Sequence, residues 1–256
     1  MSFFTALGVE FQKIRRSKIL LILLIPVVIM WIPSIVNARI NFDTRNIPIT
    51  PENNFFIQGF MGMVWFIIPA SLVICTVLLT QTERSQRGIL KMLSLPVSIV
   101  KLCLAKFLVL VMLSLVQMLL AVCAYYISAA AASQLQHYDF VLKPDFVFPV
   151  VLRIYLAAIP MAAVFWMLAV LIQTPVFAAG AGLVSSVPSV LIINTKLWFL
   201  YPISYPFYLL MIEYGKVAQG VYETEIQWLP WIPAAIVITI AALAVSCIRF
   251  GAAERR

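Results

Sequence analysis

Charged residues are scarce in this chain of 256 residues. Asp, Glu, Lys and Arg make up 11% of it, whereas 63% of the residues are hydrophobic. A soluble domain carries about one quarter charged residues. This deficit excludes an ordinary soluble globular domain. The composition predicts an all-α integral membrane protein that forms one domain over residues 1–256.

Histidine is nearly absent, and acidic residues are absent from the middles of the apolar runs. The single histidine, His137, lies in a polar stretch, so the chain cannot assemble a His-based metal site or a catalytic triad. The missing carboxylates argue against a proton or sodium relay through the membrane. We therefore expect no catalytic residue and no metal site.

Three further patterns are missing. There is no G-x-x-x-x-G-K-[ST] segment, so the chain cannot bind ATP through a P-loop, and any energy must come from a partner. The basic residues do not form a dense patch with interleaved aromatics, which excludes nucleic acid as a partner. The cysteines have no C-x-x-C spacing, and we interpret them as packing residues: Cys75, Cys103, Cys123 and Cys247.

Long apolar runs dominate what is present. Runs of 18 residues or more, at about 1.5 Å per helical residue, are long enough to cross a bilayer. We predict six spans, with a kink at Pro69 in the second: residues 19–36, 55–80, 102–132, 146–173, 176–194 and 228–248. The stretch 197–212 is short, rich in aromatics and broken by two prolines, so we interpret it as external interfacial or re-entrant helices between spans five and six.

The first apolar run has a second interpretation, as a signal peptide. The long amphipathic segment before it and the further spans after it favour a membrane span.

The charge distribution predicts the orientation. With six spans, one side of the membrane holds twelve basic and three acidic residues, and the other holds six basic and seven acidic residues. Basic residues close to spans are retained on the cytoplasmic side. We therefore expect both termini in the cytoplasm and the loops at 39–54 and 133–144 outside.

Two amphipathic segments lie on the basic side. Residues 1–18 carry apolar side chains at helical spacing opposite Glu10, Lys13 and Arg16, which predicts an N-terminal interfacial helix. Residues 83–98 form the second segment. Helical spacing there places three basic residues on one face, Pro96 ends the helix, and Ser98 can cap the next one.

The outer boundary carries charged and aromatic residues. Arg153 can pair with Glu213 and order an outer vestibule, or it can extend to the lipid headgroups. Three tyrosines in the aromatic stretch can contact an amphipathic ligand or anchor the chain in the interface: Tyr201, Tyr205 and Tyr208.

Span five has a small-x-x-x-small pattern, Ala178 and Gly182, which allows close helix approach. This pattern predicts packing either between two membrane subunits or within one chain.

Two motifs resemble those of a known family. The segment 10–18, EFQKIRRSK, resembles the E-x-x-K-x-x-R-S opening of type 2 ABC exporter permeases, especially the lantibiotic-immunity and bacitracin-type branch. The segment 83–98, ERSQRGILKMLSLPVS, followed by Lys106, resembles their E-x-x-x-x-G-(T)-x-K-x-x-L-x-x-P-V-S-R…K element. Ile89 stands where Thr is commonest, and Ile99 replaces the usual basic residue after P-V-S.

In that family the second element is the coupling helix, which inserts into a cleft of the ATPase subunit. The resemblance therefore implies a cytoplasmic coupling helix in region 83–98, with these ATPase-coupling residues: Glu83, Arg84, Arg87, Gly88, Lys91, Leu93 and Pro96.

The resemblance also implies a function. It implies a permease of the bacterial plasma membrane, within an ATP-driven exporter that expels an amphipathic, lantibiotic-like peptide and confers immunity or resistance. Two copies of an ABC ATPase would bind ATP and Mg, and a second permease would be a different homologous chain. Three alternatives stay open: an exporter of a lipid-linked glycan, drug or ion, a non-transporting peptide sensor, and a membrane enzyme. The lack of paired carboxylates disfavours the enzyme.

Overall fold

The computed structural model describes residues 3–44, 47–84, 98–218 and 224–253. All regular structure in these ranges is helical. In chain order the elements are α1 (Phe3–Arg16), α2 (Ile19–Val36), the 3-10 helix η1 (Ala38–Phe42), α3 (Pro51–Gly62), the π-helix η2 (Met63–Ile67), α4 (Ile68–Arg84), α6 (Ile99–Gln136), α7 (Pro144–Leu171), α8 (Pro175–Ser186), α9 (Ser189–Ile192), the 3-10 helices η3 (Trp198–Leu200) and η4 (Pro202–Ser204), α10 (Tyr205–Val217) and α11 (Trp228–Ala253).

Six helical stretches of the described chain are long and apolar enough to cross a membrane, which confirms the predicted number and the all-α membrane class. They are Ile19–Val36, Pro51–Thr80, Ile99–Gln136, Pro144–Leu171, Pro175–Ile192 and Trp228–Phe250. The stretch 197–212 is not among them. It forms the short helices η3 and η4 and the first half of α10.

Spans two and five are not continuous α-helices. In span two the π-helix η2 joins α3 to α4 just before Pro69, close to the predicted kink. Proline and π-turns are two of the recognised causes of helix bending. In span five α8 ends at Ser186, and α9 begins after Pro188. The span predicted over 176–194 is therefore present but interrupted at Pro188, because proline lacks an N–H and its ring clashes with the preceding turn.

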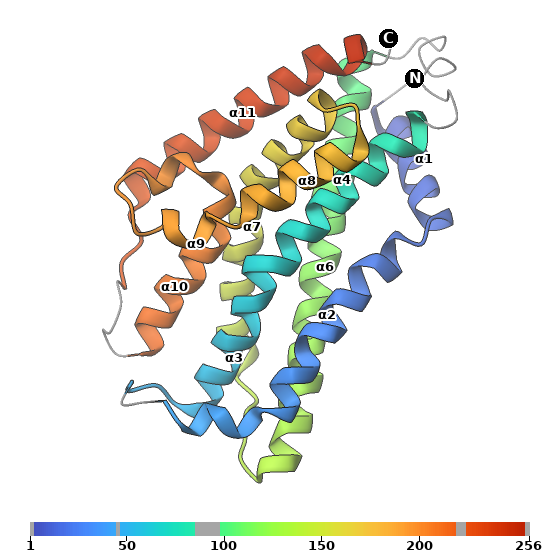
Figure 1. Ribbon diagram of the computed structural model, residues 1–256. Coiled ribbons are helices and arrows are strands. Elements are labelled where there is room, and N and C mark those ends of the chain that lie inside the picture. The colour runs from blue at the N-terminus through green and yellow to red at the C-terminus, as the bar shows by residue number, and fades with distance from the viewer. Residues whose placement is uncertain (1–2, 45–46, 85–97, 219–223, 254–256) are drawn as a thin grey trace.

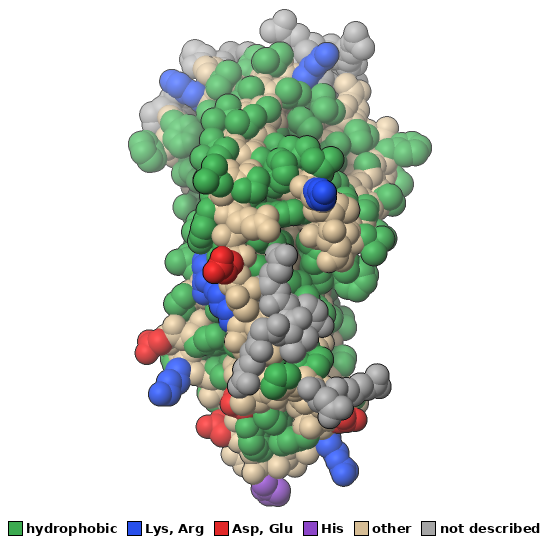
Figure 2. Space-filling view, turned by 90° about the vertical axis from the view of Figure 1, so that its left-hand side faces the viewer, with side chains coloured by type: hydrophobic (Ala, Val, Ile, Leu, Met, Phe, Trp, Pro, Cys, Tyr) green, Lys and Arg blue, Asp and Glu red, His purple; other side chains and the backbone are tan. Residues whose placement is uncertain are grey.

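The two termini lie at one end of the molecule (Figure 1), together with the end of α4 and the start of α6. We call this the terminal end. The opposite, loop end carries η1 and the connection between α6 and α7. In Figure 2, hydrophobic side chains cover much of the surface, and the acidic side chains on this face lie in its lower half, toward His137. An apolar surface of this extent suits contact with lipid.

Helices α6 and α7 form the centre of the bundle. Helix α6 contacts α1, α2, α4 and α11, and α7 contacts α4, α10 and α11. An aromatic cluster fills the space between α2, α3 and α6: the ring of Trp31 lies 5.6 Å from that of Phe60 and 5.7 Å from that of Tyr125, between ring centroids. The outward side of α2 is exposed and entirely apolar, as a lipid-facing helix requires.

Candidate functional site

Helix α1 packs against α6 through the face that carries Glu10. Glu10 is 1% exposed, and Ala6 and Ile14 beside it are also buried, whereas Phe4 is 79% exposed. The sequence predicted that Glu10 lies on the polar face of this helix, opposite its apolar side chains. That prediction is wrong for Glu10, because a lysine inside the bundle needs its carboxylate.

The lysine is Lys106, one of the residues that the structure brings to this site and that sequence reasoning did not pair. Its Nζ lies 2.9 Å from Glu10 Oε2, and both side chains are 1% exposed. Lys106 Nζ also donates a hydrogen bond to the carbonyl oxygen of Leu79 on α4, at 3.4 Å. Lys13 Nζ donates to the other oxygen of Glu10 at 2.6 Å. We call Glu10, Lys13, Lys106 and the Leu79 carbonyl the terminal clamp.

The terminal clamp joins three helices: α1, α4 and α6. Burial acts to raise the pKa of Glu10, but the opposing attraction and hydrogen bonds of Lys106 and Lys13 hold that pKa below its ordinary value. Glu10 is therefore ionised at neutral pH. Removing one partner from a buried ion pair costs about 3–5 kcal/mol, since it leaves an uncompensated charge.

The terminal clamp lies beside the predicted coupling segment. Helix α4 ends at Arg84 and α6 begins at Ile99, so these two helices flank residues 85–97. Ser98 caps α6 as predicted, since its Oγ accepts a hydrogen bond from Lys101 N at 3.3 Å. Glu83 and Arg84 belong to the last turn of α4. The other predicted coupling residues lie outside the described residues: Arg87, Gly88, Lys91, Leu93 and Pro96.

A second buried contact ties α6 to the irregular part of span two. Gln117 is 1% exposed, and its Nε2 donates to Ser71 Oγ at 2.7 Å and to the carbonyl oxygen of Ile67 at 3.5 Å. Ile67 is the last residue of the π-helix. Spans two and three are therefore bonded at two levels, through Lys106 near the terminal end and through Gln117 deeper in the bundle.

Near the loop end, Arg153 of α7 pairs with Glu213 of α10, as hypothesised from the sequence. Arg153 Nη1 lies 2.7 Å from Glu213 Oε1, and Lys216 Nζ lies 2.8 Å from the same oxygen. Glu213 is buried, while the basic side chains are more than one third exposed. Water around those cations weakens the pairs. A role for them in an outer vestibule stays a prediction.

The predicted vestibule tyrosines make internal contacts. Tyr205 is fully buried, and its hydroxyl donates to the carbonyl oxygen of Phe199 at 2.5 Å. Tyr208 is 5% exposed and stacks on Trp198, with ring centroids 3.8 Å apart. The hydroxyl of Tyr201 donates to the carbonyl oxygen of Ser185. These contacts hold η3 and Tyr201, which follows it, against α8 and α10. An effect of the tyrosines on substrate range stays a prediction.

The small residues of span five also pack inside the chain. Ala178 is buried, and a Cβ on Gly182 would lie 2.5 Å from Val73 Cγ2 on α4. The close approach at Gly182 therefore belongs to the contact of α8 with α4, which is the second interpretation of the pattern. Contact of this pair with another permease stays a prediction.

Comparison with known proteins identifies the family. The model of the ABC-2 family transporter protein matches residues 6–189. No curated protein and no solved structure matches the chain. The matched range covers most of α1, the terminal clamp, the connection between α4 and α6 and most of span five. The chain therefore belongs to the ABC-2 family of transporter proteins and is a multi-pass membrane permease component of an ABC transporter.

Proposed function

We propose that this permease exports an amphipathic, lantibiotic-like peptide from the bacterial plasma membrane. Membership in the ABC-2 family implies an ABC ATPase partner. In our proposal two ATPase copies, each with ATP and Mg, act on this chain and on a second, homologous permease. ATP-driven closure of the ATPases pushes on residues 84–95, and α4 and α6 carry the movement to the loop end.

The observation that carries the proposal is the double attachment of α4 to α6. A segment can transmit a push only if the helices that flank it move together. The terminal clamp fixes α6 to α4 and α1 close to the segment, and Gln117 fixes α6 to span two again further along. A buried ion pair and a buried amide bond both resist sliding, because separating them leaves unpaired polar groups in the bundle.

The orientation in the proposal places the terminal end in the cytoplasm. By sequence, the segments at this end hold twelve basic and three acidic residues, whereas the loop-end segments hold six and seven. The bias of basic residues toward the cytoplasmic side favours this arrangement.

The experiment that tests the function is affinity purification of the chain in mild detergent, followed by identification of the proteins that co-purify. We expect an ABC ATPase and a second permease. We also expect ATP hydrolysis by the complex to rise on addition of a lantibiotic. An isolated chain that binds the peptide without any nucleotide-dependent activity would instead support a sensor.

A prediction for the coupling segment follows from the proposal. Arg87→Glu or Gly88→Trp should abolish peptide-stimulated ATP hydrolysis while leaving membrane insertion intact, because the first reverses a charge and the second adds bulk where the ATPase would dock. Lys143→Glu, at the loop end, is the matched control and should keep the stimulation. Normal stimulation in both coupling variants would remove the coupling role.

A second prediction concerns orientation. In a chain without its native cysteines, Gln134→Cys should react with a membrane-impermeant maleimide in intact cells, and Lys101→Cys should react only after permeabilisation. Both side chains are exposed and lie near opposite ends of α6. The native cysteines must be removed because Cys123 is exposed. The reverse labelling pattern would overturn the orientation.

A further inference from the structure

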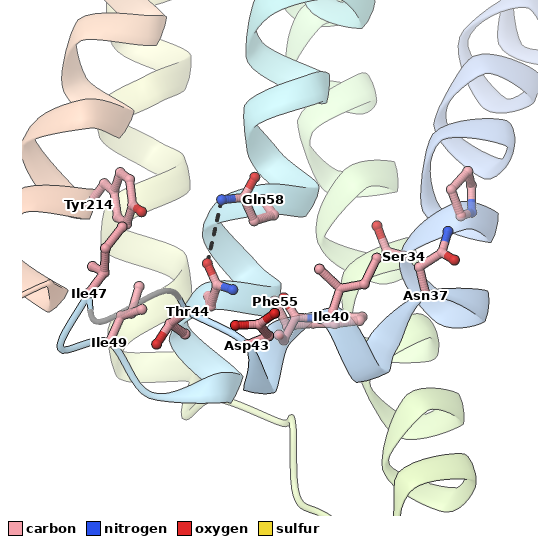
Figure 3. A pocket seen from close by; sticks show the side chains of 13 residues that line it. Ser34, Asn37, Ile40, Asp43, Thr44, Ile47, Ile49, Phe55, Gln58 and Tyr214 are labelled. Carbon is pink, nitrogen blue, oxygen red and sulfur yellow. Dashed lines mark hydrogen bonds between the residues drawn. The ribbon is translucent and has the colours of Figure 1, made fainter.

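A cavity opens at the loop end between α2 and α10 (Figure 3). Its volume is about 480 Å³, within the range of roughly 300–1,000 Å³ that is usual for small-molecule pockets. The end of α2, η1, the chain after η1, the start of α3 and Tyr214 of α10 form its wall. The predicted vestibule residues do not line it. The sequence identified this region only as an external loop.

Several polar side chains around this cavity have no side-chain partner in the described part of the chain. Ser34 and Asn37 at the end of α2, and Asp43 and Thr44 after η1, make no side-chain hydrogen bond or ion pair with any described residue. Figure 3 shows Ser34 and Asn37 on one side of the space and Thr44 on the other, with Asp43 between them. These groups offer hydrogen-bond donors and acceptors that no described residue uses.

Other lining residues are already fixed. Asn41 is 7% exposed, and its Nδ2 donates to the carbonyl oxygen of Ala38 at 2.9 Å. Gln58 Nε2 donates to Asn54 Oδ1 at 3.5 Å (Figure 3). These bonds hold η1 and α3 in place and so keep the shape of the cavity. A preformed cavity loses less ordering entropy when a ligand binds.

The lining combines one charge with apolar surface. Asp43 is the only charged residue among the thirteen described residues that line the cavity. Apolar surface is supplied by Pro33, Ile40, Ile47, Ile49, Phe55 and the ring of Tyr214. A carboxylate selects a cation, the unused amides and hydroxyls can bond to peptide groups, and the apolar wall can hold aliphatic side chains. These three properties together describe one kind of ligand.

We propose that this cavity binds a short segment of an amphipathic peptide that carries a single positive charge, with the cation at Asp43. The proposal rests on the proposed function and deepens it, because it gives the transported peptide a first binding site on the outer side of the permease. Asp43 binds the cationic group, Asn37 and Thr44 bond to the backbone of the segment, and Ile40, Phe55 and Tyr214 contact its aliphatic side chains.

The test measures direct binding to the purified chain in nanodiscs of phosphatidylcholine, a lipid without net charge. The probes are two dansyl-labelled peptide amides of the sequence Leu-Gly-Leu-Lys, one with a free lysine side chain and one with that side chain acetylated. We expect the charged probe to bind about tenfold more tightly, the factor that one charge-assisted hydrogen bond supplies. Empty nanodiscs give the background from lipid.

Three variants test whether the probes bind in the cavity rather than elsewhere on the chain. Asp43→Asn should remove the preference for the charged probe and leave the affinity for the acetylated probe unchanged. Ser34→Trp should fill the space and weaken both probes about tenfold. Glu225→Gln removes an exposed carboxylate outside the cavity and should behave as the unmodified chain does. Each variant must first show the gel-filtration profile of the unmodified chain.

The other outcomes overturn the inference. No binding above empty nanodiscs, equal affinity for both probes, or a preference that persists in Asp43→Asn each contradicts it. Because the assay needs no ATPase, the two proposals fail separately. Co-purification of an ATPase without Asp43-dependent binding overturns the site alone, and Asp43-dependent binding by a chain without any ATPase partner overturns the exporter alone.

Discussion

Lys106→Met should lower the free energy of unfolding of the permease by about 3 kcal/mol. Glu10 would stay buried with Lys13 as its remaining partner in the terminal clamp, and the Leu79 carbonyl would lose a donor. The expected loss is at the low end of the range of about 3–5 kcal/mol for broken buried pairs, because Lys13 is retained. Thermal unfolding in detergent should show a midpoint that is several degrees lower, and ATP hydrolysis by the complex should no longer respond to peptide.

Two variants separate the ion pair from a simple loss of positive charge. Lys101→Met removes an exposed lysine from the first turn of the same helix and should change the stability by less than about 0.5 kcal/mol. The double variant Glu10→Gln with Lys106→Met should recover most of the lost stability, since the charges of Glu10 and Lys106 are then both removed from the bundle. Equal unfolding midpoints for Lys106→Met and the unmodified chain would contradict the prediction.

The same pair makes the stability depend on pH. Lys106 and Lys13 hold the pKa of Glu10 below the ordinary value of a glutamate. A depressed pKa contributes stability that is complete above the pKa of the unfolded chain and is lost as the pH falls through that of the folded chain. The difference in stability between the unmodified chain and Lys106→Met should therefore narrow in acid.

Gly59→Leu should be the second severe substitution. A Cβ on Gly59 of α3 would lie 2.3 Å from Trp31 Cζ3 and 2.4 Å from Cη2, much closer than ordinary contact. The ring of Trp31 is 2% exposed and surrounded by Phe55, Phe60 and Tyr125, so it has no space to move. We expect a loss of about 3 kcal/mol or more, measured by thermal unfolding, because overpacking forces the backbone apart.

The chain offers a matched control for this substitution. Gly180 on α8 is exposed, and a Cβ there would meet nothing within 4 Å. Gly180→Leu should leave the stability unchanged or raise it slightly, since leucine favours a helix more than glycine does. Adding Trp31→Ala to Gly59→Leu should restore part of the loss by opening space. A similar loss in both leucine variants would show that the Trp31 contact is not the cause.

The spans could be predicted because their signal is local. The length of an apolar run can be read directly from the sequence. For span three, the predicted range 102–132 therefore differs from the observed Ile99–Gln136 by only three or four residues at each end. The pairing of Arg153 with Glu213 could also be hypothesised, since a cation close to hydrocarbon requires a partner and few acidic residues exist. The break of span five at Pro188 could also have been predicted locally, because a proline inside a helix interrupts it.

The terminal clamp could not be predicted by local pattern. Glu10 has the spacing of a water-facing residue, and its partner lies 96 residues further along the chain. One signal was available: Lys106 lies inside an apolar run and requires a counter-charge, which excludes simple exposure to lipid. The cavity at the loop end could not be predicted from the sequence either. It is formed by loop residues whose positions depend on η1, α3 and α10 together.

The length of α6 has a mechanical consequence. Its 38 residues extend over about 57 Å, nearly twice the roughly 30 Å of a hydrocarbon core. In the proposed export cycle, α6 would turn together with the helices clamped to it, as a lever about the level of Gln117 near its middle. If it turned by about 5° at that point, each tip would sweep about 2–3 Å in opposite directions. A small push on one side of the membrane would thereby move the other side in the opposite direction.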